Sequence, residues 1–378
     1  MQGRGLLQRY DQRVTTLDAA IALFEQAAHV DERFALAYAA LGEALWRKYD
    51  LTADVALVEP ARRAALRAVQ LNPAVAKVHM TLGIVQRGTG QYEDALKAFE
   101  QGRILNAPPA EVYRELALTY EALRRYSDAE ATYLKGISER PGEPSLHSRL
   151  GAFYAARGAY DKAAAQFERV IQLTPENARA ASNLGGTYVY LKRVTAAEQQ
   201  FRRSVQLEPS DSAFSNLGTL YFQQGRYVEA AEAFEQAVRI RDTDRRVRAN
   251  LAAAYEAIKD PTRARASWTR AAALAEPQLQ IDPRRADVIA DLSFFRAAVG
   301  NSRQARQLVR DAVQLAPQDA RVLFRAATTY AQLQDRDMAA DLVIRALDAG
   351  ISAEQVRESD PLIPIREMPI VQARLAAP

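Results

Sequence analysis

The sequence predicts an all-α solenoid, in which helix pairs stack one after another along the chain. The first observation is a period of 34 residues in the leucines Leu82, Leu116, Leu150 and Leu184. The second is the three- and four-residue spacing of apolar side chains within each period, which is typical of amphipathic helices. The third is a proline near the end of many periods, such as Pro175, because proline fits the first turn of a following helix.

Each period reads as two helices joined by a tight turn. In the period that contains Leu150-Gly151, the second helix carries Ala163 and Phe167. The small residues Gly151 and Ala163 let the two helices approach closely, and Phe167 fills the seam with the next period. Gly158 lies where the first helix must stop and turn.

This pattern, a leucine–small-residue pair followed by Tyr, Ala and an aromatic residue and closed by proline, resembles the tetratricopeptide repeat over residues 35–350. The resemblance implies a right-handed superhelix of about nine or ten helix pairs. The repeats are expected at 35–75, 76–109, 110–143, 144–177, 178–210, 211–244, 245–285, 286–319 and 320–350. The first and seventh are longer, and we expect a longer first helix or loop in one and a longer second helix, with a kink at Pro277, in the other.

The chain ends depart from the pattern. Residues 1–34 read as a degenerate repeat, whose Ala20 and Phe24 match a second helix, and residues 351–378 read as capping helices over the last open face. The opening Gly3-Arg4-Gly5-Leu6-Leu7 and the closing Asp360-Pro361-Leu362 are similar to repeat arrays behind bacterial serine/threonine kinase or cyclase domains. That similarity implies a piece of a larger signalling protein.

Composition argues against several functions. The net charge of +4 comes from 50 basic and 46 acidic residues in a mixed pattern, which favours neither nucleic acid nor a membrane surface. The chain has no cysteine, so disulfides and thiolate sites are excluded. His79 and His147 share one repeat position and are expected to be packing residues. With no phosphate-binding glycine loop or metal-ligand spacing, we expect no enzymatic activity, cofactor or metal.

The residue before each repeat leucine is expected to face a concave groove. That position holds Ala40, Thr81, Glu115, Arg149, Asn183, Asn216, Asn250, Asp291 and Arg325. The three consecutive asparagines matter because an amide offers both a donor and an acceptor to a peptide backbone. Asparagine is also a mediocre helix former. The row resembles the asparagine ladder of O-GlcNAc transferase and the grooves of co-chaperone clamp domains. The alternative is that asparagine is simply a common residue at this repeat position, and that Asn183, Asn216 and Asn250 are solvated.

Neighbouring residues on the same helices complete the predicted groove. Small side chains would form its floor, aromatic rings would bracket a ligand side chain and arginines would take acidic groups. These further candidates are Arg179, Ser182, Tyr190, Ser215, Thr219, Phe222, Gln223, Arg246 and Glu256.

We therefore expect a non-catalytic protein-interaction scaffold that binds extended, acidic peptide segments weakly in this groove. The alternatives are a structural or oligomerisation scaffold and a regulatory or sensor region of a larger bacterial signalling protein. We expect a monomer, with no nucleic-acid partner and no membrane span, because no apolar stretch approaches the roughly 20 residues needed. The compartment is expected to be the cytoplasm, with the periplasm as the alternative.

Overall fold

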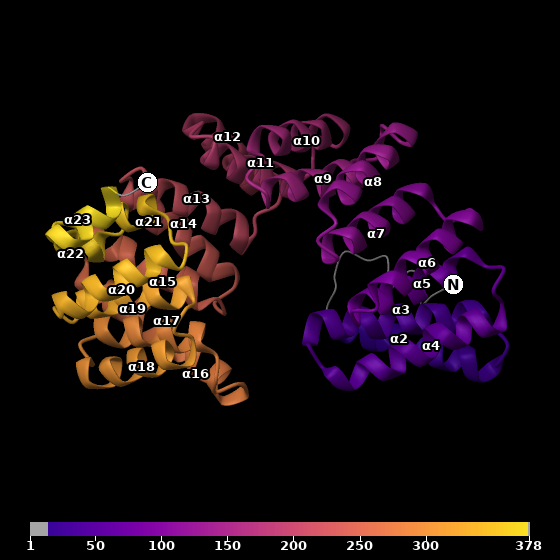
Figure 1. Cartoon of the computed structure of the whole chain (residues 1–378), viewed down its shortest axis with the longest axis horizontal. Coiled ribbons are helices and arrows are strands. Elements are labelled where there is room, and N and C mark those ends of the chain that lie inside the picture. Colours follow the sequence, from indigo (N-terminus) through magenta and orange to yellow (C-terminus); the bar gives the residue numbers. More distant parts are fainter. Residues whose placement is uncertain (1–13, 377–378) are drawn as a thin grey trace. The chain divides into compact units, whose positions relative to one another are not determined.

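The computed structural model describes residues 14–376 and divides the chain into two compact units, Met1–Leu191 and Lys192–Pro378. We call them the N-terminal unit and the C-terminal unit. All secondary structure in the described residues is helical, with 22 α-helices, two short 3-10 helices and no strand, so the predicted all-α fold is confirmed. In each unit the helices follow one another in chain order (Figure 1).

The N-terminal unit contains ten of these α-helices and one 3-10 helix. They are α2 (Val14–Val30), α3 (Ala35–Thr52), η1 (Val55–Leu57), α4 (Val58–Leu71), α5 (Ala76–Gly88), α6 (Tyr92–Ile104), α7 (Pro109–Ala122), α8 (Tyr126–Glu139), α9 (Pro144–Ala155), α10 (Tyr160–Leu173) and α11 (Ala178–Tyr190). The first 13 residues, which include part of the predicted degenerate repeat and the Gly3–Leu7 segment, lie outside the described range.

The C-terminal unit holds the remaining helices. They are α12 (Val194–Leu207), α13 (Asp211–Gln223), α14 (Tyr227–Ile240), α15 (Arg245–Ala257), α16 (Pro261–Ile281), α17 (Ala286–Ala298), α18 (Ser302–Leu315), α19 (Ala320–Gln332), α20 (Arg336–Asp348), α21 (Ala353–Arg357), η2 (Asp360–Leu362), α22 (Ile363–Arg366) and α23 (Pro369–Ala376).

Consecutive helices pack as antiparallel pairs, namely α3/α4, α5/α6, α7/α8, α9/α10, α13/α14, α15/α16, α17/α18 and α19/α20. The turn inside a pair needs one left-handed residue. Gly158 supplies it between α9 and α10, with φ of 71°, at no steric cost because it has no Cβ. Some first helices begin with a side-chain cap, as where the Asn177 side chain accepts from the Ala180 amide.

The repeated glycine and aromatic residue are in direct contact. A Cβ added to Gly151 would lie 2.8 Å from the Phe167 ring, and one added to Gly218 would lie 2.9 Å from the Phe234 ring. Both distances are too short for real carbon atoms, so in these two pairs a methyl group would force the ring to shift. The sixteen-residue spacing of these pairs in the sequence is thus a packing constraint between the first and second helix.

Both longer repeats extend a helix. Helix α3 has 18 residues and is followed by η1, and α16 has 21 residues with Pro277 inside it. The first insertion therefore lengthens the first helix and adds a short helical loop, and the second lengthens the second helix.

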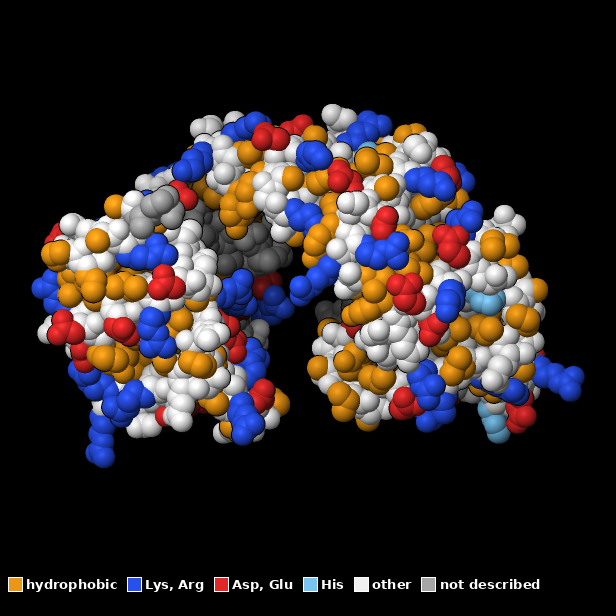
Figure 2. All heavy atoms as spheres, viewed as in Figure 1, with side chains coloured by type: hydrophobic (Ala, Val, Ile, Leu, Met, Phe, Trp, Pro, Cys, Tyr) orange, Lys and Arg blue, Asp and Glu red, His pale blue; other side chains and the backbone are white. Residues whose placement is uncertain are grey.

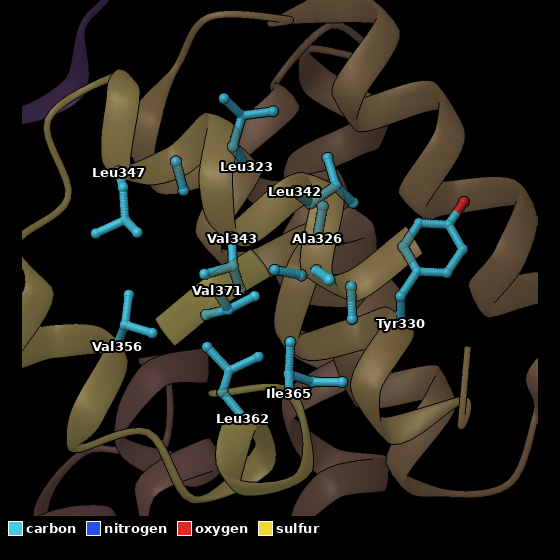
Figure 3. Close-up of a cluster of buried hydrophobic side chains, with 14 of the residues drawn as sticks. Leu323, Ala326, Tyr330, Leu342, Val343, Leu347, Val356, Leu362, Ile365 and Val371 are labelled. Atoms are coloured by element: carbon cyan, nitrogen blue, oxygen red, sulfur yellow. The ribbon is translucent and has the colours of Figure 1, made fainter. Parts of the chain in front are cut away.

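Residues 351–376 pack on the last helix pair. Val356, Leu362, Ile365 and Val371 are buried against α19 and α20, where they meet Leu342 and other apolar side chains (Figure 3). Ser352 starts α21 with a reciprocal capping box to Gln355. Ile370 lies on the outer side of α23 and is 60% exposed.

The two histidines are packing residues, as predicted. His79 and His147 are buried, and each places Nε2 at a proline carbonyl, 2.8 Å from Pro73 and 3.2 Å from Pro141. The carbonyl only accepts, so Nε2 carries the proton in both rings.

Candidate functional site on the first-helix face

One side of each first helix is turned away from its paired second helix. We call this surface the first-helix face; α3, α5, α7, α9 and α11 form it in the N-terminal unit, and α13, α15, α17 and α19 form it in the C-terminal unit. The residue before the repeat leucine was predicted to be exposed here. Arg149, Asn216 and Asn250 are exposed and Asn183 is half-buried. The same position is buried in four other helices, at Ala40, Thr81, Glu115 and Asp291.

The buried positions occur where charges on neighbouring first helices pair with one another. Lys77 of α5 bridges Glu43 of α3, at 3.0 Å, and Glu111 of α7, at 3.4 Å. Glu115 is held by Arg87 at 3.0 Å and by Arg114 at 2.9 Å. In this part of the face the protein satisfies its own charges, which leaves few groups for a ligand.

The ion pairs of Glu43 predict that the protein becomes less stable at acid pH. Burial alone would raise the pKa of Glu43, but the charges and hydrogen bonds of Lys77 and Arg47 outweigh it and hold the pKa below its usual value. A carboxyl with a lowered folded pKa stabilises the fold above its unfolded pKa of about 4.3 and loses that contribution as the pH falls further. We expect the unfolding free energy, measured in urea between about pH 6 and pH 3, to fall more steeply for the wild type than for Glu43→Gln. Parallel curves would contradict this role for Glu43.

The face opens into a pocket over α7, α9 and α11. Its volume is about 320 Å3. Arginines and small polar side chains line it, namely Arg114, Ser145, Ser148, Arg149, Ala152, Arg179 and Asn183. Two of the predicted residues, Arg179 and Asn183, are therefore part of one pocket within the N-terminal unit.

The pocket carries uncompensated positive charge. Arg114 is neutralised by Glu115 at 2.9 Å, whereas Arg149 and Arg179 are exposed and form no ion pair within residues 14–376. The amide of Asn183 and the hydroxyl groups of Ser145 and Ser148 add neutral donors and acceptors beside them. This set can hold a carboxylate with arginine and a peptide group with the amide.

The predicted row of three amides spans the two units. Asn183 lies in the N-terminal unit, whereas Asn216 and Asn250 lie on α13 and α15 of the C-terminal unit. Helices α13 and α15 are in contact, although only loosely, and both of their asparagines are exposed. A continuous ladder therefore stays a prediction.

The other predicted groove residues differ in what they contact. Tyr190 is 66% exposed and stacks on Tyr160 with 4.5 Å between ring centroids. Phe222 is half-buried and packs edge-on against Tyr227 at 5.1 Å. Tyr190 and Phe222 belong to different units, so their predicted joint grip on one side chain stays a prediction.

The remaining polar candidates lie on α11, α13 and α15. Ser182 is half-buried and Gln223 is exposed. Thr219 is half-buried, and its hydroxyl donates to the Ser215 carbonyl at 2.8 Å. Arg246 is exposed, 3.8 Å from Asp244.

Glu256 is already engaged within the protein. Trp268 Nε1 donates to it at 2.8 Å, and partial burial raises its pKa although this hydrogen bond opposes the shift.

Sequence reasoning missed Arg114, Ser145 and Ser148 as groove residues. The sequence does hint at this part of the groove. At the position five residues before the repeat leucine, four successive repeats carry Lys77, Glu111, Ser145 and Arg179. Lys77 and Glu111 have opposite charges and form an ion pair, whereas Ser145 in the next repeat is neutral. Arg179 is left without the acidic neighbour that the earlier helices have.

No group of three or more His, Asp or Glu residues in positions 14–376 is arranged to hold a metal ion. Among the same residues no helix is long and apolar enough to cross a membrane. Basic and acidic side chains alternate over the surface that faces the viewer in Figure 2, which agrees with the mixed charge pattern of the sequence.

The chain is similar to several solved structures at low identity. A monomeric mutant of IFIT1 with m7Gppp-AAAA is 15% identical over 80% of this chain and 77% of that chain, with a TM-score of 0.48. The human IFIT1 dimer with PPP-AAAA is 20% identical over 80% and 69%, with a TM-score of 0.47. YrrB, described as a TPR protein with an unusual peptide-binding site, is 19% identical over 49% and 92%, with a TM-score of 0.33. No curated protein matches the sequence.

Three family models, each described as tetratricopeptide repeat, match residues 80–144, 154–219 and 212–244. The matched segments lie in both units and cover helix pairs of the kind described above. Together with the glycine–aromatic packing repeated along the chain, these matches show that both units of the chain contain tetratricopeptide repeats.

Proposed function

We propose that the chain is a non-catalytic scaffold that binds extended acidic segments of partner proteins on the first-helix face. The observation that supports this best is the pocket over α7, α9 and α11, where Arg149 and Arg179 have no ion pair within the described residues. On the other first helices of the N-terminal unit, acidic neighbours pair with Lys77, Arg87 and Arg114. Two unpaired arginines beside an amide suit a ligand that brings carboxylates on an exposed backbone.

The geometry favours an extended ligand over a compact one. Arg149 and Arg179 come from neighbouring first helices that lie about one helix diameter, roughly 10 Å, apart. Successive side chains on the same side of an extended peptide are about 7 Å apart, so two acidic residues one or two such steps apart can reach both arginines. The Asn183 amide can then pair with a peptide group between them. Each contact is exposed, so the affinity is expected in the micromolar range.

The proposal predicts that the two arginines carry the affinity. A fluorescent extended peptide with alternating glutamates is titrated into the full chain, and binding is followed by anisotropy. We expect Arg149→Ala/Arg179→Ala to weaken binding by about 1.5–3 kcal/mol for each lost charge-assisted hydrogen bond. Arg169→Ala is the matched control, because Arg169 is exposed on α10, outside the pocket. Equal affinity for both variants would remove the pocket from the proposal.

The contribution of the amides is tested separately. Asn216→Ala should weaken binding of a longer acidic peptide by about 0.5–1.5 kcal/mol if the amide holds the peptide backbone. A peptide in which glutamine replaces glutamate should lose the same binding energy when Asn216 is replaced by alanine, because the amide contact does not depend on ligand charge. If the alanine variant binds both peptides as the wild type does, the asparagine row has no part in recognition. We propose the cytoplasm as the compartment, with the periplasm as the alternative; a chain without cysteine is compatible with both.

A further inference from the structure

A second groove lies on the N-terminal unit, between α2 and α4, with α3 as its floor. We call it the α2–α4 groove. Its volume is about 580 Å3, larger than the pocket over α7, α9 and α11. The floor is formed by Tyr38, Leu41 and Leu45 of α3, and Ile21 and Leu57 extend the apolar surface at its sides. No residue of the proposed peptide pocket takes part in it.

The equivalent groove over α14, α15 and α16 is smaller, with a volume of about 390 Å3, and a side-chain bridge crosses it. Tyr255 of α15 donates its hydroxyl to Glu235 of α14 at 2.7 Å. Arg263 of α16 lies over the Tyr255 ring, 4.4 Å from its centroid, and pairs with Glu235 at 3.3 Å. The three side chains tie the helices on both sides of the groove to its floor.

The same bridge occurs between α8, α9 and α10. Tyr154 donates to Glu130 at 2.7 Å, and Lys162 reaches Glu130 at 3.2 Å. Lys162 also lies 4.9 Å from the centroid of the Tyr154 ring. The bridge is therefore a recurring device of this chain and occurs in both units.

The α2–α4 groove lacks two of the three bridge residues. Leu45 follows Leu41 by four residues, as Tyr255 follows Leu251, and so takes the place of the tyrosine. Pro60 precedes Ala61 as Arg263 precedes Ala264, and so takes the place of the cation. Only the acidic residue, Glu25, is kept. Without the hydroxyl and the cation this bridge cannot form, and apolar side chains form the floor.

The two sides of the groove carry opposite charges. Asp18 and Glu25 lie on the α2 side, and Arg63 and Arg67 lie on the α4 side. Asp18 is paired with Lys48 at 2.7 Å, whereas Glu25, Arg63 and Arg67 make no ion pair with any residue of the described range. The acidic positions span about two turns of α2, or roughly 10 Å, and the arginines span about one turn of α4, or roughly 6 Å.

A helix fits this groove better than an extended strand does. The peptide pocket offers the amide of Asn183 to an extended backbone, whereas the α2–α4 groove is lined by no asparagine or glutamine side chain. A bound helix satisfies its own backbone and presents an apolar stripe at i, i+3, i+4 and i+7. Side chains beside that stripe then meet the two charged sides of the groove.

We propose that the α2–α4 groove docks an amphipathic helix of a partner protein. The helix has an apolar stripe with basic residues along one flank and acidic residues along the other. The apolar stripe covers Leu41 and Leu45, the basic flank meets Glu25, and the acidic flank meets Arg63 and Arg67. This surface is separate from the peptide pocket, so one chain can hold two segments at once.

The test uses the full chain and three designed helical peptides of about 15 residues, the length that an isolated helix needs. All three share one leucine stripe. The first has one basic and one acidic flank, the second has two acidic flanks and the third has two basic flanks. By anisotropy we expect the mixed peptide to bind at least tenfold more tightly than either uniform peptide. Reversing the direction of a helix exchanges its flanks, so the uniform peptides are the proper controls.

Two protein variants complete the design. Leu45→Tyr/Pro60→Arg rebuilds the bridge with Glu25 and should reduce binding of the mixed peptide at least tenfold without lowering the melting temperature. Arg63→Glu/Arg67→Glu makes both sides acidic, and the preference should then move to the uniformly basic peptide. This gain of binding cannot arise from misfolding.

Several results would overturn the proposal. One is equal binding of the three peptides, and another is unchanged binding to the variant with the rebuilt bridge. Tighter binding after deletion of residues 1–13 would assign the groove to the chain's own N-terminal segment. A concentration-dependent mass in light scattering that disappears in Leu45→Tyr/Pro60→Arg would assign it to a second copy of the chain.

Discussion

Replacing Phe167 with alanine is expected to lower the free energy of opening of the α9–α10 region by about 3–5 kcal/mol. Phe167 is 2% exposed and lies in one cluster with Tyr133, Leu150 and Leu184, which come from three other helices. Its loss removes a large apolar surface from burial and leaves a cavity that neighbouring helices cannot fill, because their backbones are fixed by the next repeats. A repeat array can open locally, so the cost should be concentrated in the helices that touch Phe167.

Hydrogen exchange measured by mass spectrometry reports this local opening helix by helix. Peptides from α9 and α10 should exchange faster by a factor of about 100 or more, since 1.4 kcal/mol corresponds to about tenfold. The control is Phe34→Ala, because Phe34 is 45% exposed and its loss should cost about 0.5 kcal/mol or less. Equal protection of α9 and α10 in both variants would show that the aromatic position is not a packing centre.

Gly151 supplies a second check on the same contact. A methyl group there would lie 2.8 Å from the Phe167 ring, so Gly151→Ala should cost about 1–3 kcal/mol through overpacking. Combined with Phe167→Leu, the same methyl group fills space that the ring has left. The double variant should therefore cost clearly less than the sum of the single variants. Additive costs would mean that the glycine is required for another reason.

The period and its packing residues could be predicted from the sequence because they repeat. The Gly151–Phe167 and Gly218–Phe234 contacts follow from one spacing, and His79 and His147 could be assigned together because they share a position. The lengthening of α3 and α16 was predicted for a related reason. An insertion of about two helical turns keeps the buried side of a helix directed inward.

The binding surface was harder to predict because residues at the same repeat position lie in different environments. Asn250 and Asp291 hold the same place before their leucines, yet Asn250 is exposed and Asp291 is 8% exposed. The difference arises because α17 and α19 pack closely, whereas α13 and α15 touch loosely. Exposure therefore depends on side chains two helices away, which a single repeat does not reveal.

The α2–α4 groove was visible in the sequence as a departure from the repeat. Leu45 stands where Tyr154, Tyr188, Tyr221 and Tyr255 stand in other repeats. The sequence does not show what the tyrosine at this position does. In the structure it donates a hydrogen bond to a glutamate across the groove, as Tyr188 does to Glu168 at 2.7 Å, and Leu45 cannot. Sequence alone shows the change of residue type, and the structure shows which contact is lost.

The second large effect is expected at Asp291. Arg245 Nε donates to Asp291 Oδ2 at 3.0 Å, and Arg325 Nε donates to Oδ1 at 3.0 Å, so this carboxylate links α15, α17 and α19. The Arg245 side chain is only 10% exposed. Asp291→Ala leaves a buried guanidinium without its main counter-charge, and we expect the unfolding free energy of the C-terminal unit to fall by about 3–5 kcal/mol.

Asp287→Ala is the control for Asp291→Ala. Asp287 is 3.5 Å from Arg245 and its side chain is 53% exposed, so its loss should cost about 1 kcal/mol or less. Urea unfolding and hydrogen exchange in α15, α17 and α19 measure both effects. Similar losses for the two variants would show that Asp291 is not the electrostatic centre of these helices.

A third variant separates charge from shape at this position. Asp291→Asn keeps the size of the side chain and its acceptor oxygen, and it copies the residue that Asn216 and Asn250 place there in earlier repeats. If hydrogen bonding alone held the three helices, the asparagine variant would be nearly as stable as the wild type. We expect instead that it loses at least half as much as the alanine variant, because two arginines share one carboxylate and an amide cannot balance a buried positive charge. This difference explains why asparagine suits the exposed middle of the first-helix face, whereas the closely packed end requires aspartate.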